Sequence, residues 1–140
     1  MEKKVTYKLD QILLLQSVFT REFKIDFTHP DLNTNLNLDD NYKIDGNQLI
    51  VILTLNFETT LKEKKLIIST ISMAGIFEFT EKIEEGPLSI QNFASINAPA
   101  IIFPFIREHF ATLTMKAGLK PILLPPVNFV EFAKQKKEAQ

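Results

Sequence analysis

The chain has 140 residues, the usual length of a single domain, so we expect one domain over residues 1–140. Its hydrophobic content of 45% and charged content of 24% are those of a globular protein and exclude a disordered tail. A net charge of −1 gives no field of one sign to attract nucleic acid or an anionic membrane, so we expect neither partner. Because there is no cysteine, disulfides and cysteine metal sites are excluded.

The N-terminal residues 1–5 are charged and lead into only a short apolar patch at residues 12–15. A secretory signal peptide needs a longer apolar stretch followed by a small-residue cleavage site. No stretch approaches the roughly 20 apolar residues that span a bilayer. We therefore expect a soluble, cytoplasmic protein.

The first two-thirds of the chain have strand character. Residues 5–15 and 22–27 are weaker strand candidates, and residues 31–40 fit either an edge strand or a loop. Residues 42–44 are expected to end a strand, because the turn signal Asp45-Gly46-Asn47 follows them.

The clearest strand pattern is the alternation of apolar residues over residues 48–57. Residues 58–62 are polar and predict a turn, after which residues 65–79 predict a long strand. Gly75 interrupts this strand, which indicates a bulge or a close approach of another backbone.

The last third of the chain has helical character. Residues 87–96 predict a short helix that begins at a proline, and residues 99–117 predict a longer one that ends at Gly118. Asn128 is a plausible N-cap of a final short helix, and the polar tail over residues 134–140 is expected to be frayed. Strands followed by helices predict an α+β fold with an antiparallel sheet and helices gathered on one side.

No arrangement of residues suggests catalysis, so we expect no enzyme and no cofactor. His29 and His109 have no histidine or cysteine partner at ligand spacing, so we expect no metal site. The carboxylate pairs Glu84-Glu85 and Asp39-Asp40 are interpreted as solvated charges in polar turns. No phosphate-binding loop or nucleophile elbow occurs.

The apolar content is unusual in kind, with 12 Phe, 2 Tyr and no Trp. Since a Phe ring has no polar group, each one needs a core, an interface or an apolar ligand around it. Composition alone leaves open whether all of them fill the core. Apolar residues surround the first turns of the helix predicted over residues 99–117 on nearly every side, which indicates subunit contact.

Three motifs in the second half of the chain occur together and in order. Residues 72–77 are Ser-Met-Ala-Gly-Ile-Phe, residues 97–108 are Asn-Ala-Pro-Ala-Ile-Ile-Phe-Pro-Phe-Ile-Arg-Glu, and residues 124–129 are Leu-Pro-Pro-Val-Asn-Phe. In order and spacing they resemble the SecB family of protein-export chaperones. The resemblance covers roughly residues 70–130 and is weak over the first 60 residues.

The resemblance implies a four-stranded antiparallel sheet with two C-terminal helices on one side. It also implies a homotetramer, built as a dimer of dimers through the long helices. Members of the family use no ATP. They hold unfolded or precursor polypeptides in hydrophobic grooves and deliver them to the SecA ATPase.

On this basis we expect two sets of functional residues. The groove for non-native polypeptide is predicted at Ile76, Phe77, Phe79, Phe103, Phe105, Phe129 and Phe132. The oligomer interface is predicted at Ile101, Ile102, Ile106, His109, Phe110 and Leu113. The alternative is that Phe77 and Phe105 are ordinary core residues.

The chain departs from the better-known family members, which are markedly acidic. Here the charge is balanced, the hairpin near Lys62, Lys64 and Lys65 is basic, and so is the tail over residues 134–137. Whether this chain docks to SecA is therefore left open. Two further functions also stay open, namely a SecB-like chaperone dedicated to one partner such as an antitoxin, and a small-molecule binder with an apolar pocket between sheet and helices.

Overall fold

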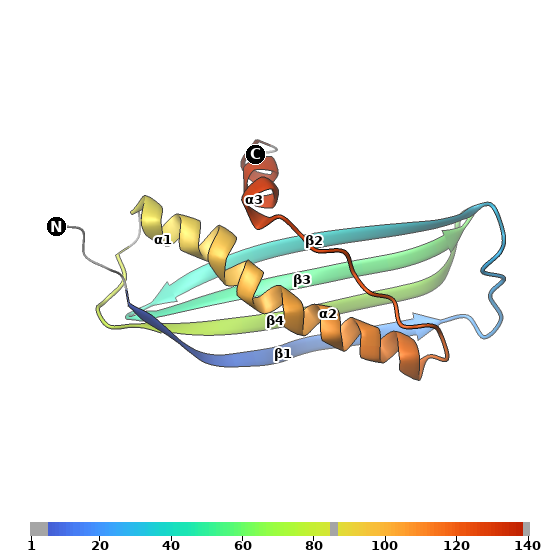
Figure 1. Cartoon of the computed structure of the whole chain (residues 1–140), viewed down its shortest axis with the longest axis horizontal. Coiled ribbons are helices and arrows are strands. Elements are labelled where there is room, and N and C mark those ends of the chain that lie inside the picture. Colours follow the sequence, from blue (N-terminus) through green and yellow to red (C-terminus); the bar gives the residue numbers. More distant parts are fainter. Residues whose placement is uncertain (1–5, 85–86, 139–140) are drawn as a thin grey trace.

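A computed structural model describes residues 6–84 and 87–138, in which four long strands precede the helices (Figure 1). The strands form one antiparallel sheet in the order β1-β4-β3-β2, so β1 and β2 are its edges. Their bounds are Tyr7–Arg21 for β1, Leu32–Asp45 for β2, Gln48–Leu61 for β3 and Lys64–Phe79 for β4.

The helices lie on one face of this sheet (Figure 1). Helix α1, Leu88–Asn92, continues through a π-helical turn, η1, at Phe93–Asn97 into α2, Ala98–Lys116. Together they form one rod that crosses the sheet diagonally. A connection returns along this rod to α3, Phe129–Glu138, which lies over β2. The predicted α+β class, with four strands and C-terminal helices on one side, is confirmed.

The register of β3 on β4 separates the sheet into two faces. Leu49 lies opposite Phe77 and Leu53 opposite Met73, all on the face under α2. From α2, Ile102, Ile106 and Phe110 complete this core and are fully buried. Since successive side chains of a strand alternate between faces, Ile50 and Ile76 point to the other side, where they are only half-buried.

Two expectations about the hairpins change in the structure. Residues 58–61 continue β3, and the turn falls at Lys62-Glu63, where Lys62 has a positive φ of 57°. The prediction of a turn from residue 58 is wrong because polar residues in a half-exposed strand occupy the open face, as Glu58 and Thr60 do here. Residues 31–40, for which edge strand and loop were both open, are part of edge strand β2.

The strand predicted over residues 22–27 is wrong. β1 ends at Arg21, whose guanidinium donates to the carbonyls of Glu22, Phe23 and Ala117 at 2.9, 3.1 and 2.6 Å. The backbone N–H of Glu22 still donates to the carbonyl of Leu66 on β4 at 2.8 Å, but the bonds of Arg21 tie the chain there to the end of α2, and residues 23–27 do not continue the ladder.

The C-terminal segment is more regular than expected. Asn128 caps α3 as predicted, because its Oδ1 accepts the backbone N–H groups of Val130 and Glu131 at 3.1 and 3.2 Å. Residues 134–138 belong to this helix, so the prediction of a frayed tail is wrong for them, and residues 139–140 lie outside the described residues.

Candidate functional site

Aromatic rings gather at two places between the sheet and the helices. At the first, Phe93 of η1 contacts Tyr7, Phe77 and Phe79, with ring centroids 4.6, 5.3 and 5.5 Å apart. Phe77 is fully buried and Phe79 is 4% exposed. These two predicted groove residues therefore lie in the core, beneath the start of the helical rod.

At the second place, rings join α2 to α3. Phe129 lies 5.7 Å from Phe103 and 5.7 Å from Phe132, measured between ring centroids. Phe103 and Phe129 are buried and Phe132 is half-buried. This cluster holds α3 against the rod and leaves one ring edge in contact with solvent.

The other two predicted groove residues lie apart from these clusters. Ile76 belongs to the sheet face away from the helices, and Phe105 projects from α2 with 46% of its surface exposed. The structure thus brings Phe103, Phe129 and Phe132 together and does not bring Ile76 to them.

Half of the predicted interface residues are covered by the chain's own sheet. Ile102, Ile106 and Phe110 have no exposed surface, whereas Ile101, His109 and Leu113 are half-buried. The His109 ring shares a 2.8 Å hydrogen bond between its Nε2 and the hydroxyl of Ser17 on β1.

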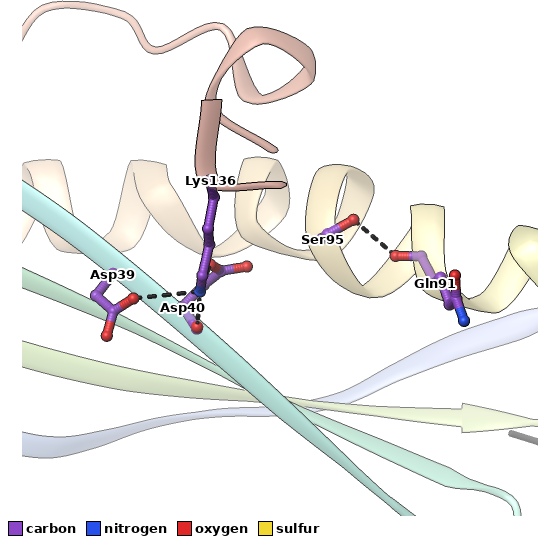
Figure 2. Close-up of polar contacts among 5 residues, drawn as sticks. All are labelled: Asp39, Asp40, Gln91, Ser95 and Lys136. Carbon is purple, nitrogen blue, oxygen red and sulfur yellow. Dashed lines mark hydrogen bonds and ion pairs between the residues drawn. The ribbon is translucent and has the colours of Figure 1, made fainter. Parts of the chain in front are cut away.

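A lysine on α3 connects that helix to edge strand β2 (Figure 2). The Nζ of Lys136 donates to Oδ1 of Asp40 at 2.6 Å, to Oδ1 of Asp39 at 3.2 Å and to the backbone carbonyl of Asp40. Asp40 is only 6% exposed. The interpretation of Asp39-Asp40 as a solvated pair in a turn is therefore wrong, because both lie within β2 and share one ammonium.

This contact affects the protonation of the lysine. Partial burial alone would lower the pKa of Lys136, but the hydrogen bonds and charges of Asp40 and Asp39 outweigh it and raise the pKa above the ordinary 10.5. The side chain is therefore an ammonium at neutral pH.

The sequence contained one signal for this contact. In β2 the apolar side chains Leu36, Leu38, Tyr42 and Ile44 alternate, and Asp40 occupies the same face. A carboxylate on a buried face needs a cation, because an unpaired buried charge is costly. Spacing along the chain could not identify Lys136 as that cation, since 96 residues separate the two.

A pocket of about 590 Å³ lies beside this ion pair. One wall is a face of α1 and η1 that includes Leu88, Ser95 and Ile96, and the floor is β2 from Asp40 to Tyr42. The opposite wall is a face of α3 formed by Val130, Ala133, Lys134 and Lys137. Figure 2 shows the ion pair at one side of this space and Ser95, which donates to the carbonyl of Gln91, on the facing helix.

Comparison with known proteins identifies a family that this chain matches over most of its length. The family model described as "Preprotein translocase subunit SecB" matches residues 15–140. The protein-export protein SecB of Nitrosomonas eutropha is 28% identical over 140 residues, covering 91% of this chain and 84% of the relative. SecB of Saccharophagus degradans is 33% identical over 100 residues, covering 71% of this chain and 55% of the relative.

The fold is also that of a solved SecB-like chaperone. Rv1957 of Mycobacterium tuberculosis, in complex with a ChAD peptide from the HigA1 antitoxin Rv1956, aligns with a TM-score of 0.72 and 15% identity. The alignment covers 86% of this chain and 90% of that one. The chain spans about five-sixths of the length of the Nitrosomonas relative and about half of the length of the Saccharophagus relative. Among the described residues, no helix has the length and hydropathy to cross a membrane.

Proposed function

This chain belongs to the SecB family, and we propose that it is an ATP-independent chaperone that holds non-native polypeptides and keeps them competent for export. The match to the family over residues 15–140 carries the proposal. Large exposed apolar side chains support it, including Leu13 and Val18 on the open face of the sheet and Phe105 on α2. Exposed apolar patches mark sites of protein interaction or ligand-binding grooves.

Light scattering by two unrelated denatured proteins, recorded without nucleotide, tests the holding activity. We expect a molar excess of the chain to suppress aggregation of both. Aggregation of both proteins at the rate seen without the chain would contradict the proposal.

A second candidate is a SecB-like chaperone dedicated to one partner, such as an antitoxin. It is favoured by the fold neighbour, whose complex contains an antitoxin peptide. This function predicts that neither unrelated denatured protein is protected and that one cognate polypeptide is bound.

We propose that the polypeptide groove is bounded by the ring cluster of Phe103, Phe129 and Phe132, because Phe132 is accessible there. Phe132→Ala should weaken capture of a denatured client and change the melting temperature little. Phe77→Ala is the matched core control and should cost about 3–5 kcal/mol, because it opens a cavity under the helical rod. Full capture of clients by a stable Phe132→Ala variant would remove this ring from the groove.

We further propose a cytoplasmic location and transfer of clients to SecA, as is general for export chaperones of this family. The hairpin at Lys62, Lys64 and Lys65 is basic, whereas the better-known members of the family are acidic, so transfer to SecA needs a test of its own. A pull-down of purified SecA with the client-loaded chain tests it, and no retained SecA would contradict it.

A further inference from the structure

We propose that the pocket between α1, α3 and β2 binds an extended polypeptide segment that carries acidic side chains among apolar ones. The inference rests on the proposed function. It adds that one part of the polypeptide-binding surface prefers client segments of a particular composition. It follows from which faces of the two helices meet across the pocket.

Two faces of the α3 helix contact different surroundings. Phe129 and Phe132 face the rod, and Lys136, one turn further, reaches β2. Val130, Ala133, Lys134 and Lys137 recur at helical spacing and line the pocket. The acidic residues of the helix, Glu131 and Glu138, are not part of this lining.

The lysines of the lining differ in their partners. Lys136 is engaged by Asp40, the one carboxylate of the lining, and by Asp39 beside it. Lys134 and Lys137 are exposed and have no ion-pair partner within the part of the chain that the structure describes. Along one wall there are therefore two ammonium groups that make no ion pair with any described residue.

The opposite wall and the floor combine accessible apolar side chains with polar ones such as Gln91, Asn92 and Ser95. Leu88 is 64% exposed and Tyr42 is 40% exposed, and Val130 beside the lysines is 60% exposed. Apolar side chains this accessible gain free energy when a ligand covers them. A ligand that satisfies both walls has apolar side chains toward Leu88 and Tyr42 and carboxylates toward Lys134 and Lys137.

Three fluorescein-labelled ten-residue peptides test this specificity. They share one apolar framework and differ in carrying two glutamates, two glutamines or two lysines. By fluorescence anisotropy in low salt, we expect the glutamate peptide to bind about fivefold more tightly than the glutamine peptide. The advantage should be lost in 0.5 M NaCl, because salt screens exposed charges.

Two double variants, each of which removes two positive charges, show which lysines cause the preference for glutamate. Lys134→Gln with Lys137→Gln should abolish the preference for glutamate. Lys62→Gln with Lys64→Gln, at the β3–β4 hairpin, removes the same charge elsewhere and should retain it. Leu88→Ser should weaken binding of all three peptides.

The inference would be overturned if the three peptides bound with equal affinity or if the lysine peptide bound most tightly. It would also be overturned if both charge variants lost the preference for glutamate to the same extent. Light scattering with a denatured client distinguishes this failure from failure of the proposed function. If the wild-type chain suppresses aggregation but shows no peptide preference, only the acidic specificity is wrong. If it suppresses none, the proposed function is wrong as well.

Discussion

Gly75 lies on β4 against the side chain of Ile102 from α2. A Cβ built at this residue would lie 2.9 Å from Cε2 of Phe77 and 3.0 Å from Cγ1 and Cδ1 of Ile102. Both neighbours are fully buried and cannot move into solvent. A side chain at this residue would therefore collide with the core, and the neighbours are side-chain atoms rather than the bulge or the approaching backbone that the sequence indicated.

Gly75→Ala should lower the free energy of unfolding by about 1–3 kcal/mol, because the added methyl group overpacks the core. Ile102→Ala removes the atoms in contact and by itself should cost about 2–5 kcal/mol. In the double variant the two losses should be less than additive, as measured by urea unfolding. Additivity within about 0.5 kcal/mol would show that Ile102 does not limit the space at Gly75.

The stability that the Lys136 ion pair contributes should depend on pH. Its pKa is raised in the folded chain by Asp40 and Asp39 against the effect of partial burial. The ion pair therefore stabilises the fold at pH values below the unfolded pKa of about 10.5, and this contribution is lost as the pH rises through the higher folded value.

Comparison of the wild-type chain with Lys136→Met between pH 8 and pH 11.5 isolates this contribution. The difference in melting temperature should stay constant up to about pH 10.5 and then shrink, because both proteins share all other titrating groups. A difference that persists unchanged to pH 11.5 would mean that the ion pair does not stabilise the fold.

At the scale of elements, α3 depends on its cap. The helix has ten residues, too few to be stable alone, and Asn128 satisfies two of its first backbone N–H groups. Asn128→Ala should destabilise α3 by about 1 kcal/mol, and Asn128→Asp should restore it. Hydrogen exchange of α3 amides should be faster in the alanine variant and unchanged in β3, whereas unchanged exchange in α3 would contradict the role of the cap.

The sequence predicted elements well where one face of each is buried. The long β3 and β4 strands and the α2 helix are found within a few residues of their predicted bounds because their apolar periodicity reports the core directly. The predictions from sequence were wrong at two segments. At residues 58–61, polar side chains occupy the open face of a strand. At residues 22–27, the bonds of Arg21, including the one to Ala117, decide the conformation. Neither cause is encoded in local periodicity.

The candidate site was less predictable than the fold. Of the seven groove residues predicted from the sequence, the structure brings Phe103, Phe129 and Phe132 into one cluster of rings. From sequence, Phe77 could not be distinguished from these rings, since a buried and an accessible ring at a junction of sheet and helix have the same pattern. The bond between Lys136 and Asp40 joins two residues that are 96 positions apart in the sequence, and no sequence motif indicates that they meet.

At the scale of the whole molecule, the sheet covers only one side of α2. The side that the sheet leaves uncovered includes Phe105, 46% exposed, with half-buried Ile101 one turn before it. His109, one turn after Phe105, is bonded to Ser17 of β1 and belongs to the side that faces the sheet. Apolar surface on a long helix is a common site of contact between subunits. We therefore expect a homotetramer in which this side of α2 is covered by another copy of the chain.

The test must avoid the residues that the chain itself buries. Polar substitution at Ile106 or Phe110 would open the core, so a change in mass could not be separated from unfolding. Phe105→Ser should lower the native mass of the assembly while circular dichroism reports unchanged strand content. Leu123→Ser, which alters a still more accessible apolar residue (67% exposed) in the connection before α3, should leave the mass unchanged. If the wild-type chain were a monomer at tens of micromolar, the apolar side of α2 would serve client binding instead of assembly.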